Sequence, residues 1–436
     1  MIPLPCLLHN TRRIHVARLG KEKWFEGCAS RWAAGIALIG AAPLICFAYL
    51  LGARLERNSR IGLHGQRFEA LRLVNSKGKT FAIVGGLPSF ICIVRGAMSW
   101  VGPEARFIDG LDLREERSRR INSVLPGLVS TWWLRNQTNV AYGEQLETDA
   151  EYVANRSIRN DLGILLRSCL AFLYGGKTGC FKDEAQILGL SIDNRTMDQA
   201  VSEILSPSHG GRAKQVSFVN VDCINQTFAD SEYREVLETS DLRLGDGIGL
   251  RIAGRILGSE VRQNVNGTDL FPKLCAALEI RGESLFLLGA KAGVANDVAA
   301  WIHNTYPQLR VAGTHHGYFS ESDEPKVLDM IRTSKATVLL VAFGAPLQEK
   351  WIRKHLEELP VVSALAVGGL FDFYSGRIPR APLWLRELGL EWAYRLYQEP
   401  GRMWRRYLVG NTVFLMRVCL ERVKRKNYNK PEVRAI

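Results

Sequence analysis

The sequence predicts an α/β protein whose main domain is a parallel sheet covered by helices. We expect an arginine-rich helical appendage after this domain and a membrane-associated α/β domain before it. Three observations support this prediction. Apolar segments of strand length alternate with helical stretches after residue 216, residues 32–53 carry no charge, and the last 60 residues hold 14 Lys/Arg against 5 Glu.

The alternation is clearest in five apolar segments. They are VSFVNV from Val216, SLFLLG from Ser284, RVAGTH from Arg310, ATVLLVAFG from Ala336 and VSALAVGG from Val362. Helical stretches lie between them, for example at 293–306 and 324–333. Strands that alternate with helices form parallel sheets, which bind ligands at the carboxyl ends of their strands. We therefore expect a Rossmann-like, nucleotide-binding architecture.

The uncharged run at 32–53 is about as long as a membrane-spanning helix. It lies between Arg31 and Arg54 and holds Pro43 near its middle. We interpret it as a membrane contact. Its length leaves open a span, a kinked helix, or a helical hairpin within one leaflet. A buried core helix is the alternative interpretation.

Composition narrows the class of protein further. A chain of 436 residues is long enough for two domains. Its nine cysteines are odd in number and show no Cys-x-x-Cys spacing, which indicates a reducing compartment and no zinc site. The net charge of +13 indicates a polyanionic partner: nucleic acid, anionic lipid or substrate phosphate. Nucleic acid would not explain the apolar run, so we expect no nucleic-acid partner.

Two glycine-rich turns are candidate sites. Asp246 lies in the segment GDGIG. A carboxylate there can act as a general base toward a sugar hydroxyl, or it can be only a turn residue. Gly289 ends the segment SLFLLG and precedes a helical stretch. Backbone N–H groups at such a helix start can receive phosphate, although an ordinary strand-to-helix turn has the same sequence.

Further polar residues follow other strands. Gln348 can hydrogen-bond a sugar or a uracil, and Glu349 can contact substrate or cap a helix. His315 and His316 should point to opposite faces of a strand, so we interpret them as structural. No Asp-x-Asp pair occurs in the chain, which favours a reaction without metal or cofactor. Arginines would then stabilise a departing diphosphate. The candidates are Arg380, Arg395, Arg402, Arg405 and Arg406.

A series of motifs between residue 185 and about residue 410 carries a family resemblance. They are Asn220, Asp246-Gly247, Asn266-Gly267-Thr268-Asp269-Leu270, Phe286-Leu287-Leu288-Gly289, Gly317-Tyr318-Phe319, Pro346 with Gln348-Glu349, Gly368-Gly369 with Phe371-Asp372, Gly376-Arg377-Ile378-Pro379-Arg380-Ala381-Pro382, Gly389-Leu390-Glu391-Trp392, Arg395, Glu399-Pro400 and Arg402. On these motifs the segment resembles the WecG/TagA/CpsF family of glycosyltransferases.

The resemblance implies an inverting transfer of a hexose, such as N-acetylmannosamine or glucose, from a UDP-sugar to a polyprenyl-diphosphate-linked sugar, without metal. It makes Asp246 the catalytic base. Phe218 and Asn264 depart from the family pattern, which often has Thr and Arg there, and this bears on the donor sugar. The substrate-binding residues that it implies are Asn220, Asn266, Gly289, Gln348, Glu349, Arg380, Arg395 and Arg402.

The first part of the chain resembles a degenerate bacterial sugar-1-phosphate transferase acting on polyprenol. The Pro-interrupted apolar helix carries this likeness, together with Arg60-Ile61-Gly62, Met98-Ser99-Trp100-Val101-Gly102-Pro103, Pro126-Gly127 and Asp149 with Glu151-Tyr152. In that family an Asp-Glu pair before Leu-Pro carries the phosphoryl chemistry. Here Gly85-Gly86 precede Leu87-Pro88, so we predict a catalytically inactive domain.

We expect four segments: an N-terminal extension (1–27), the degenerate membrane-associated domain (28–176), the Rossmann-like domain (185–376) and a basic amphipathic appendage (377–436). The expected partners are a UDP-sugar, a polyprenyl-diphosphate-linked sugar, membrane lipid and other polysaccharide assembly proteins. The expected location is the cytoplasmic face of the inner membrane, in surface or exopolysaccharide synthesis. Two alternatives stay open: a bifunctional initiating sugar-1-phosphate transferase, and a non-enzymatic scaffold of a polysaccharide assembly complex.

Overall fold

The computed structural model describes residues 8–75, 78, 85–106, 116–138, 145–174, 181–208 and 210–428. The chain divides into two compact units, Met1–Lys177 and Thr178–Ile436, which we call unit 1 and unit 2. Residues 1–7 of the expected N-terminal extension and residues 429–436 of the expected appendage lie outside the described residues. The four segment boundaries expected from the sequence stay predictions.

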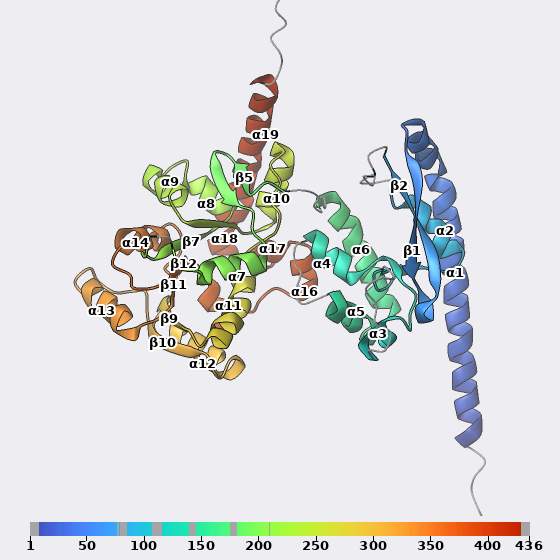
Figure 1. Ribbon diagram of the computed structural model, residues 1–436, viewed down its shortest axis with the longest axis horizontal. Helices are drawn as coiled ribbons and strands as arrows, with labels where there is room; N and C mark the ends of the chain where they lie inside the picture. The colour runs from blue at the N-terminus through green and yellow to red at the C-terminus, as the bar shows by residue number, and fades with distance from the viewer. Residues whose placement is uncertain are drawn as a thin grey trace, which may run out of the picture. The chain divides into compact units, whose positions relative to one another are not determined.

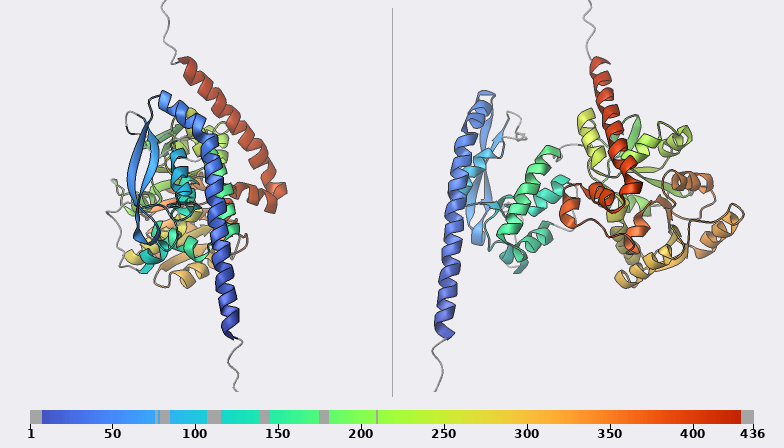
Figure 2. Two further views of the ribbon diagram at one scale, coloured as in Figure 1. Left: turned by 90° about the vertical axis from the view of Figure 1, so that its right-hand side faces the viewer. Right: turned by 180° about the vertical axis from the view of Figure 1, so that it is seen from behind.

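Helix α1 (Leu8–Leu50) of unit 1 has two different faces. Ala34, Ala41 and Ala48 are buried and recur every seventh residue, so they lie on one side of the helix. This side packs on α2 (Phe90–Val94) and on strand β2 (Arg67–Val74), and Figure 2 shows the helix running beside the two-stranded sheet. Large apolar side chains are exposed elsewhere on the helix: Trp32, Ile36, Ile39, Phe47 and Leu50.

The apolar part of α1, Gly27–Leu50, is long and apolar enough to cross a membrane. The helix runs through Pro43 as one continuous element, so the structure has a single helix where the sequence also allowed a helical hairpin. A helix that turns alanines toward its own unit and bulky apolar groups outward is suited to a lipid environment.

The rest of unit 1 is a small α/β arrangement. Strands β1 and β2 form an antiparallel pair, and strands β3 and β4 form a parallel pair. The bounds are β1 Arg54–Ile61, η1 Leu63–Gly65, η2 Leu87–Ser89, β3 Ser99–Val101, α3 Glu116–Ile121, β4 Gly127–Val129, α4 Thr131–Thr138, α5 Gln145–Ala154 and α6 Ile158–Tyr174.

Unit 2 is built on an eight-stranded sheet in the order β10-β9-β11-β12-β7-β8-β6-β5. All neighbouring strands are parallel except β5, which runs antiparallel to β6 at the edge. The strands are β5 Glu184–Ile187, β6 Leu190–Asp193, β7 Lys214–Val219, β8 Leu242–Gly245, β9 Ser284–Gly289, β10 Arg310–His315, β11 Val338–Ala342 and β12 Ser363–Ala366. The expected α/β fold with a mostly parallel sheet is confirmed.

Every residue of the central strands β7, β9, β11 and β12 is buried. Such runs are typical of parallel strands with both faces covered, and Figure 1 shows helices on both sides of the sheet. The helices are α7 Met197–Leu205, α8 Val221–Gln226, α9 Ser231–Glu238, α10 Ile248–Leu257, α11 Gly267–Arg281, α12 Val294–Thr305, α13 Glu324–Ser334, α14 Leu347–His355 and α15 Leu370–Tyr374. Strand β7 ends two residues earlier than the segment VSFVNV suggested, because Asn220 caps helix α8.

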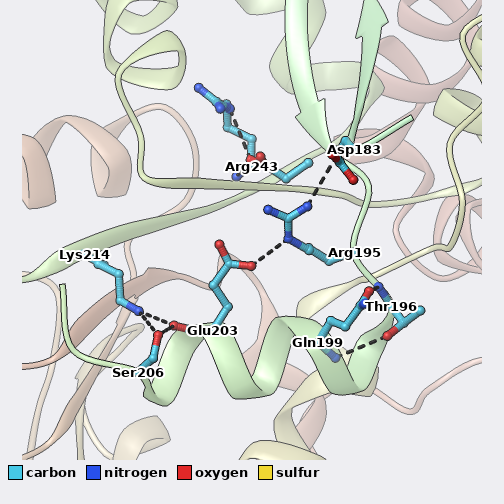
Figure 3. A network of polar contacts seen from close by, with 9 residues as sticks. Asp183, Arg195, Thr196, Gln199, Glu203, Ser206, Lys214 and Arg243 are labelled. Atoms are coloured by element: carbon cyan, nitrogen blue, oxygen red, sulfur yellow. Dashed lines mark hydrogen bonds and ion pairs between the residues drawn. The ribbon is translucent and has the colours of Figure 1, made fainter. Parts of the chain in front are cut away.

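Helix α7 is held in place by a polar network, drawn in Figure 3. Thr196 and Gln199 form a reciprocal capping box at its start, with bonds of 3.2 Å and 2.9 Å. The Arg195 guanidinium donates to the Glu203 carboxylate at 2.7 Å, farther along the helix. Lys214 of β7 donates to the Ser206 hydroxyl at 3.0 Å, just after the helix ends. These contacts fix α7 to the turn that follows β6 and to β7.

The C-terminal part of unit 2 is helical, as expected. It consists of α16 (Leu383–Glu387), α17 (Glu391–Gln398), α18 (Pro400–Trp404), a π-helical turn (Arg405–Val409) and α19 (Gly410–Tyr428). Helix α19 packs on α8 and α10, and Phe414 and Val418 insert into the core cluster that those helices share. Figure 2 shows the helix extending from the body of unit 2.

The packing of α19 on α8 and α10 gives a first prediction. Phe414→Ala should lower the free energy of unfolding by about 3–5 kcal/mol, because it leaves a cavity where a buried ring packed. Leu415→Ala is the control, since the neighbouring Leu415 is 40% exposed, and it should cost much less. Denaturation of the detergent-solubilised protein measures both. Equal losses of stability in the two variants would mean that Phe414 does not pack against α8 and α10.

Candidate active site

The predicted catalytic residue Asp246 lies directly after strand β8, at the carboxyl edge of the sheet. Its backbone N–H donates to the Val219 carbonyl at the end of β7 at 2.7 Å. Gly247 has φ +94° and begins helix α10, a conformation that favours glycine. A Cβ on Gly249 would lie 2.4 Å from the Val221 side chain. The glycines of the GDGIG segment thus allow β8 to turn tightly beside β7.

Burial raises the pKa of the Asp246 carboxyl to about 6. The negative charges of Glu391 and Asp269 raise this pKa too, whereas the Arg406 cation and a hydrogen bond from the Asn220 side chain lower it. A carboxylate with such a pKa is ionised at pH 7 and is a stronger base than an exposed aspartate. These properties suit Asp246 to the predicted role of general base, which stays a prediction.

Asn220 is placed by helix α8, which it caps. Its side-chain oxygen accepts the Cys223 N–H at 3.1 Å, and the same side chain hydrogen-bonds the Asp246 carboxyl. The structure thus brings together two of the residues singled out by the sequence. Arg406 joins them from the π-helical turn, with its Nε 3.3 Å from Asp222 of α8.

Asn266 and Arg380 belong to a second polar group beside Asp246. The Asn266 side chain caps helix α11, accepting the Asp269 N–H at 2.8 Å and donating to the Asp269 carboxylate at 2.7 Å. Arg380 ion-pairs with Asp269 and donates to Glu391 at 3.1 Å. Two carboxylates therefore offset the charge of Arg380, which ties the start of the appendage to α11.

Gln348 and Glu349 are almost completely buried at the start of α14. The Gln348 side-chain oxygen accepts the Gly344 N–H at 3.1 Å and the Gly368 N–H at 2.9 Å, so it joins the loops that follow β11 and β12. Its nitrogen donates to the Glu349 carboxylate at 2.9 Å. Burial raises the pKa of Glu349 to about 7. Both side chains are thus buried beneath the loops at the carboxyl edge of the sheet. Their contact with substrate stays a prediction.

The remaining predicted arginines differ in their surroundings. Arg395 packs over the Phe373 ring at 5.3 Å and against Gly369 in the loop after β12. Within the described parts of the chain it makes no ion pair, so its charge is available to an anion. Arg402 is 66% exposed and pairs with Glu399 at 3.4 Å, and the exposed Arg405 packs over the Trp404 ring.

Gly289 ends β9 where three strands come close together. It has φ +136°, and a Cβ there would lie 2.6 Å from the Ala342 carbonyl oxygen of β11. The Gly317 N–H, which follows β10, donates to the Ala290 carbonyl at 2.8 Å. Helix α12 begins after Gly293. The close backbone packing accounts for Gly289 structurally, and a phosphate contact there stays a prediction.

The expectation that His315 and His316 point to opposite faces is wrong. Their rings lie 4.5 Å apart, and the His315 Nδ1 lies 2.8 Å from the His316 carbonyl oxygen. The reason is that β10 ends at His315, so strand alternation does not extend to His316. No group of three His, Cys, Asp or Glu side chains suited to a metal occurs in the part of the chain that the structure describes.

Comparison with known proteins shows the family of this chain. Residues 185–428 match the model of the Glycosyl transferase WecG/TagA/CpsF family, more than half of the chain. The chain belongs to this family. Residues 84–175 of this glycosyltransferase also match the model of bacterial sugar transferases. Both expected resemblances are confirmed.

Two curated relatives of the glycosyltransferase share the name N-acetylglucosaminyldiphosphoundecaprenol N-acetyl-beta-D-mannosaminyltransferase. The protein from Bacillus subtilis (strain 168) is 34% identical over 217 residues, which cover 50% of this chain and 84% of the relative. The protein from Staphylococcus aureus (strain MW2) is 28% identical over 245 residues, which cover 56% of this chain and 94% of the relative. The expected class of enzyme, a hexosyltransferase, is confirmed.

The residues that prediction from sequence missed are mainly those that orient others. Glu391 and Asp269 act on the Asp246 carboxyl across space, and Asn264 accepts the Gly247 N–H at 2.7 Å. Asp269 and Glu391 stood within motifs that carried the family resemblance, but no spacing in the sequence linked them to Asp246.

The hydrogen bond from Asn220 predicts a shift in the pH dependence of the glycosyltransferase. A base is active when ionised, so the transfer rate should rise as the pH increases through the Asp246 pKa of about 6. Asn220→Ala removes a donor to the carboxylate, so the rise should move to higher pH. Thr196→Ala also removes a helix cap, that of α7, and should leave the profile unchanged. Initial rates from pH 5 to 8 measure this, and an unshifted profile in Asn220→Ala would contradict it.

Gln348 gives a prediction about stability. Gln348→Leu should lower the free energy of unfolding by about 2–3 kcal/mol, because it removes the acceptor of the Gly344 and Gly368 N–H groups. Gln398→Leu is the control, since that exposed amide makes one bond to Pro379, and it should change stability by less than about 0.5 kcal/mol. Chemical denaturation distinguishes them. A stable Gln348→Leu variant without activity would instead favour a direct substrate contact.

Proposed function

We propose that this protein is a metal-independent, inverting glycosyltransferase that moves a hexose from a UDP-sugar to a polyprenyl-diphosphate-linked sugar. The names of the relatives support the acceptor class and a hexosaminyl donor group. The observation that carries the proposal is Asp246, a partly buried carboxylate at the carboxyl end of β8 whose pKa is raised to about 6.

In the proposed reaction the Asp246 carboxylate accepts the proton of an acceptor hydroxyl. The hydroxyl oxygen forms a bond to the anomeric carbon of the donor from the face opposite the diphosphate. The bond between the anomeric carbon and the diphosphate oxygen breaks, and UDP leaves with the electron pair. Arg395 is proposed to stabilise this leaving group, because it lies against Gly369 in the loop after β12 and no carboxylate in the described residues pairs with it.

Unit 1 is proposed to be catalytically inactive. Gly85 stands at one of the positions of the expected acidic pair, and its carbonyl accepts the Leu73 N–H of β2 at 2.9 Å. The acids retained from the family resemblance are used within the unit: Asp149 pairs with Arg106 at 3.2 Å, and Glu151 pairs with Arg135 at 2.9 Å. These contacts support a structural role and speak against the bifunctional initiator.

The location is proposed to be the cytoplasmic face of the inner membrane, in surface or exopolysaccharide synthesis. The exposed apolar side chains of Gly27–Leu50 support membrane attachment. Exposed apolar residues of α19, such as Met416, Leu420 and Val423, provide a second surface on a strongly basic part of the chain.

The decisive test uses membranes that contain the full-length protein, a panel of UDP-sugars and a synthetic polyprenyl-diphosphate N-acetylglucosamine. We expect UDP release and a lipid-linked disaccharide, formed also in the presence of a chelator. Asp246→Asn should lower the rate by about 10²–10⁴-fold. Asp329→Asn, at an exposed aspartate of α13, should leave it unchanged.

Other outcomes would overturn the proposal in different ways. Product formed from polyprenyl phosphate and a UDP-sugar alone would favour the initiating transferase. An Asp246→Asn variant with the wild-type rate would remove the assigned base. An anomeric configuration retained from donor to product, read by NMR, would exclude the single displacement.

A further inference from the structure

The segment that joins α10 to α11, Ser259–Asn266, has no regular secondary structure, yet its position is fixed by a series of hydrogen bonds. At its start, the Ser259 hydroxyl accepts the Gln186 N–H of β5 at 2.7 Å. At its end, Asn266 caps α11. We call it the 259–266 segment.

Asn194, after β6, binds the first half of this segment. Its side chain donates to the Glu260 carbonyl at 3.0 Å and accepts the Arg262 N–H at 3.0 Å. The same amide donates to the Lys182 carbonyl at 2.9 Å, and Asn194 is only 5% exposed. A buried amide that makes three such bonds fixes the path of the backbone.

The second half of the segment binds the turn that carries Asp246. The Val265 N–H donates to the Gly245 carbonyl at 2.9 Å. The Asn264 side-chain oxygen accepts the Gly247 N–H at 2.7 Å. The 259–266 segment therefore binds the residues on both sides of Asp246. The Val265 backbone binds Gly245, and the Asn264 side chain binds Gly247.

The hydrogen bond that the Asn264 side chain accepts from the Gly247 N–H supports an unusual backbone conformation. Gly247 has φ +94°, and its side-chain-free backbone can adopt many other conformations. Gly247 also starts α10, whose first N–H groups receive no side-chain cap from it. An acceptor on its N–H thus limits how the peptide after Asp246 can rotate.

We propose that Asn264 is a positioning residue for the transfer reaction, which holds the Asp246 turn in place through the Gly247 N–H. The inference rests on the proposed role of Asp246 as base. Asn264 acts on the turn through the Gly247 backbone N–H, so its loss should lower kcat more than it changes KM. A base displaced by a fraction of an ångström loses rate even where the donor still binds.

The test combines kinetics with hydrogen exchange of the full-length protein in detergent. In Asn264→Ala, peptides covering 245–250 should exchange at least about tenfold faster, because Gly247 loses its acceptor. The kcat should fall about tenfold, and the KM for the UDP-sugar should change less than about threefold. In Asn264→Asp a carboxylate oxygen can accept the same N–H, so exchange should return to the wild-type rate.

Asn264→Asp also adds a negative charge near Asp246, so its pH profile should move to higher pH. Gln263→Ala is the matched control. Gln263 is the preceding residue of the 259–266 segment, and its side chain accepts the Met197 N–H of α7 at 2.7 Å. It should leave both the exchange of 245–250 and kcat at wild-type values.

The inference is overturned if Asn264→Ala keeps wild-type exchange and kcat, if Asn264→Asp does not restore exchange, or if Gln263→Ala gives the same losses. Because exchange is read without substrate, the two proposals fail separately. If the wild-type protein transfers no sugar while Asn264→Ala still speeds the exchange of 245–250, the proposed function is refuted. The role of Asn264 in fixing the Asp246 turn is then still supported.

Discussion

The buried parallel sheet of unit 2 constrains everything that the site contains. The strands β7, β9, β11 and β12 are covered along their whole length, so the residues that follow the strands are the ones that can face a ligand. Parallel strands end at the same edge. Asn220, Asp246, Gly289, Gly344 and Gly368 follow or end five different strands, and the sheet gathers them although they span 149 residues of sequence.

Side-chain amides organise this edge. Gln348 joins two loops through their N–H groups, Asn220 joins α8 to the Asp246 carboxyl, and Asn264 holds the turn after that carboxyl. An amide can donate and accept at once without carrying charge. Gln348 and Asn264 accept backbone N–H groups and so fix the backbone near an ionisable aspartate without adding a charge, whereas an arginine or a carboxylate in the same place would add one.

The sequence was informative where local pattern and buried surface agree. The strands β9 and β10 were predicted with their observed bounds, because SLFLLG and RVAGTH each begin with a polar residue and end with glycine or a polar residue. Strands β5, β6 and β8 were not among the predicted apolar segments; each has only four residues, β5 is the edge strand, and β8 contains Arg243. The site was predicted through residues that follow strands. Its charge balance was not, because Glu391 and Asp269 reach Asp246 only through the packing of the appendage on α11.

The alanine seam of α1 sets different tolerances on two sides of one helix. Ala34, Ala41 and Ala48 leave no room for a longer side chain, since each is buried against its unit. The exposed positions between them, such as Ile36, Ile39 and Phe47, need only be apolar. Over evolutionary time the seam should therefore drift slowly and toward glycine or serine, while the outer face exchanges one large apolar residue for another. In related sequences, small residues at every seventh position of this helix would then mark the side that packs on the rest of unit 1.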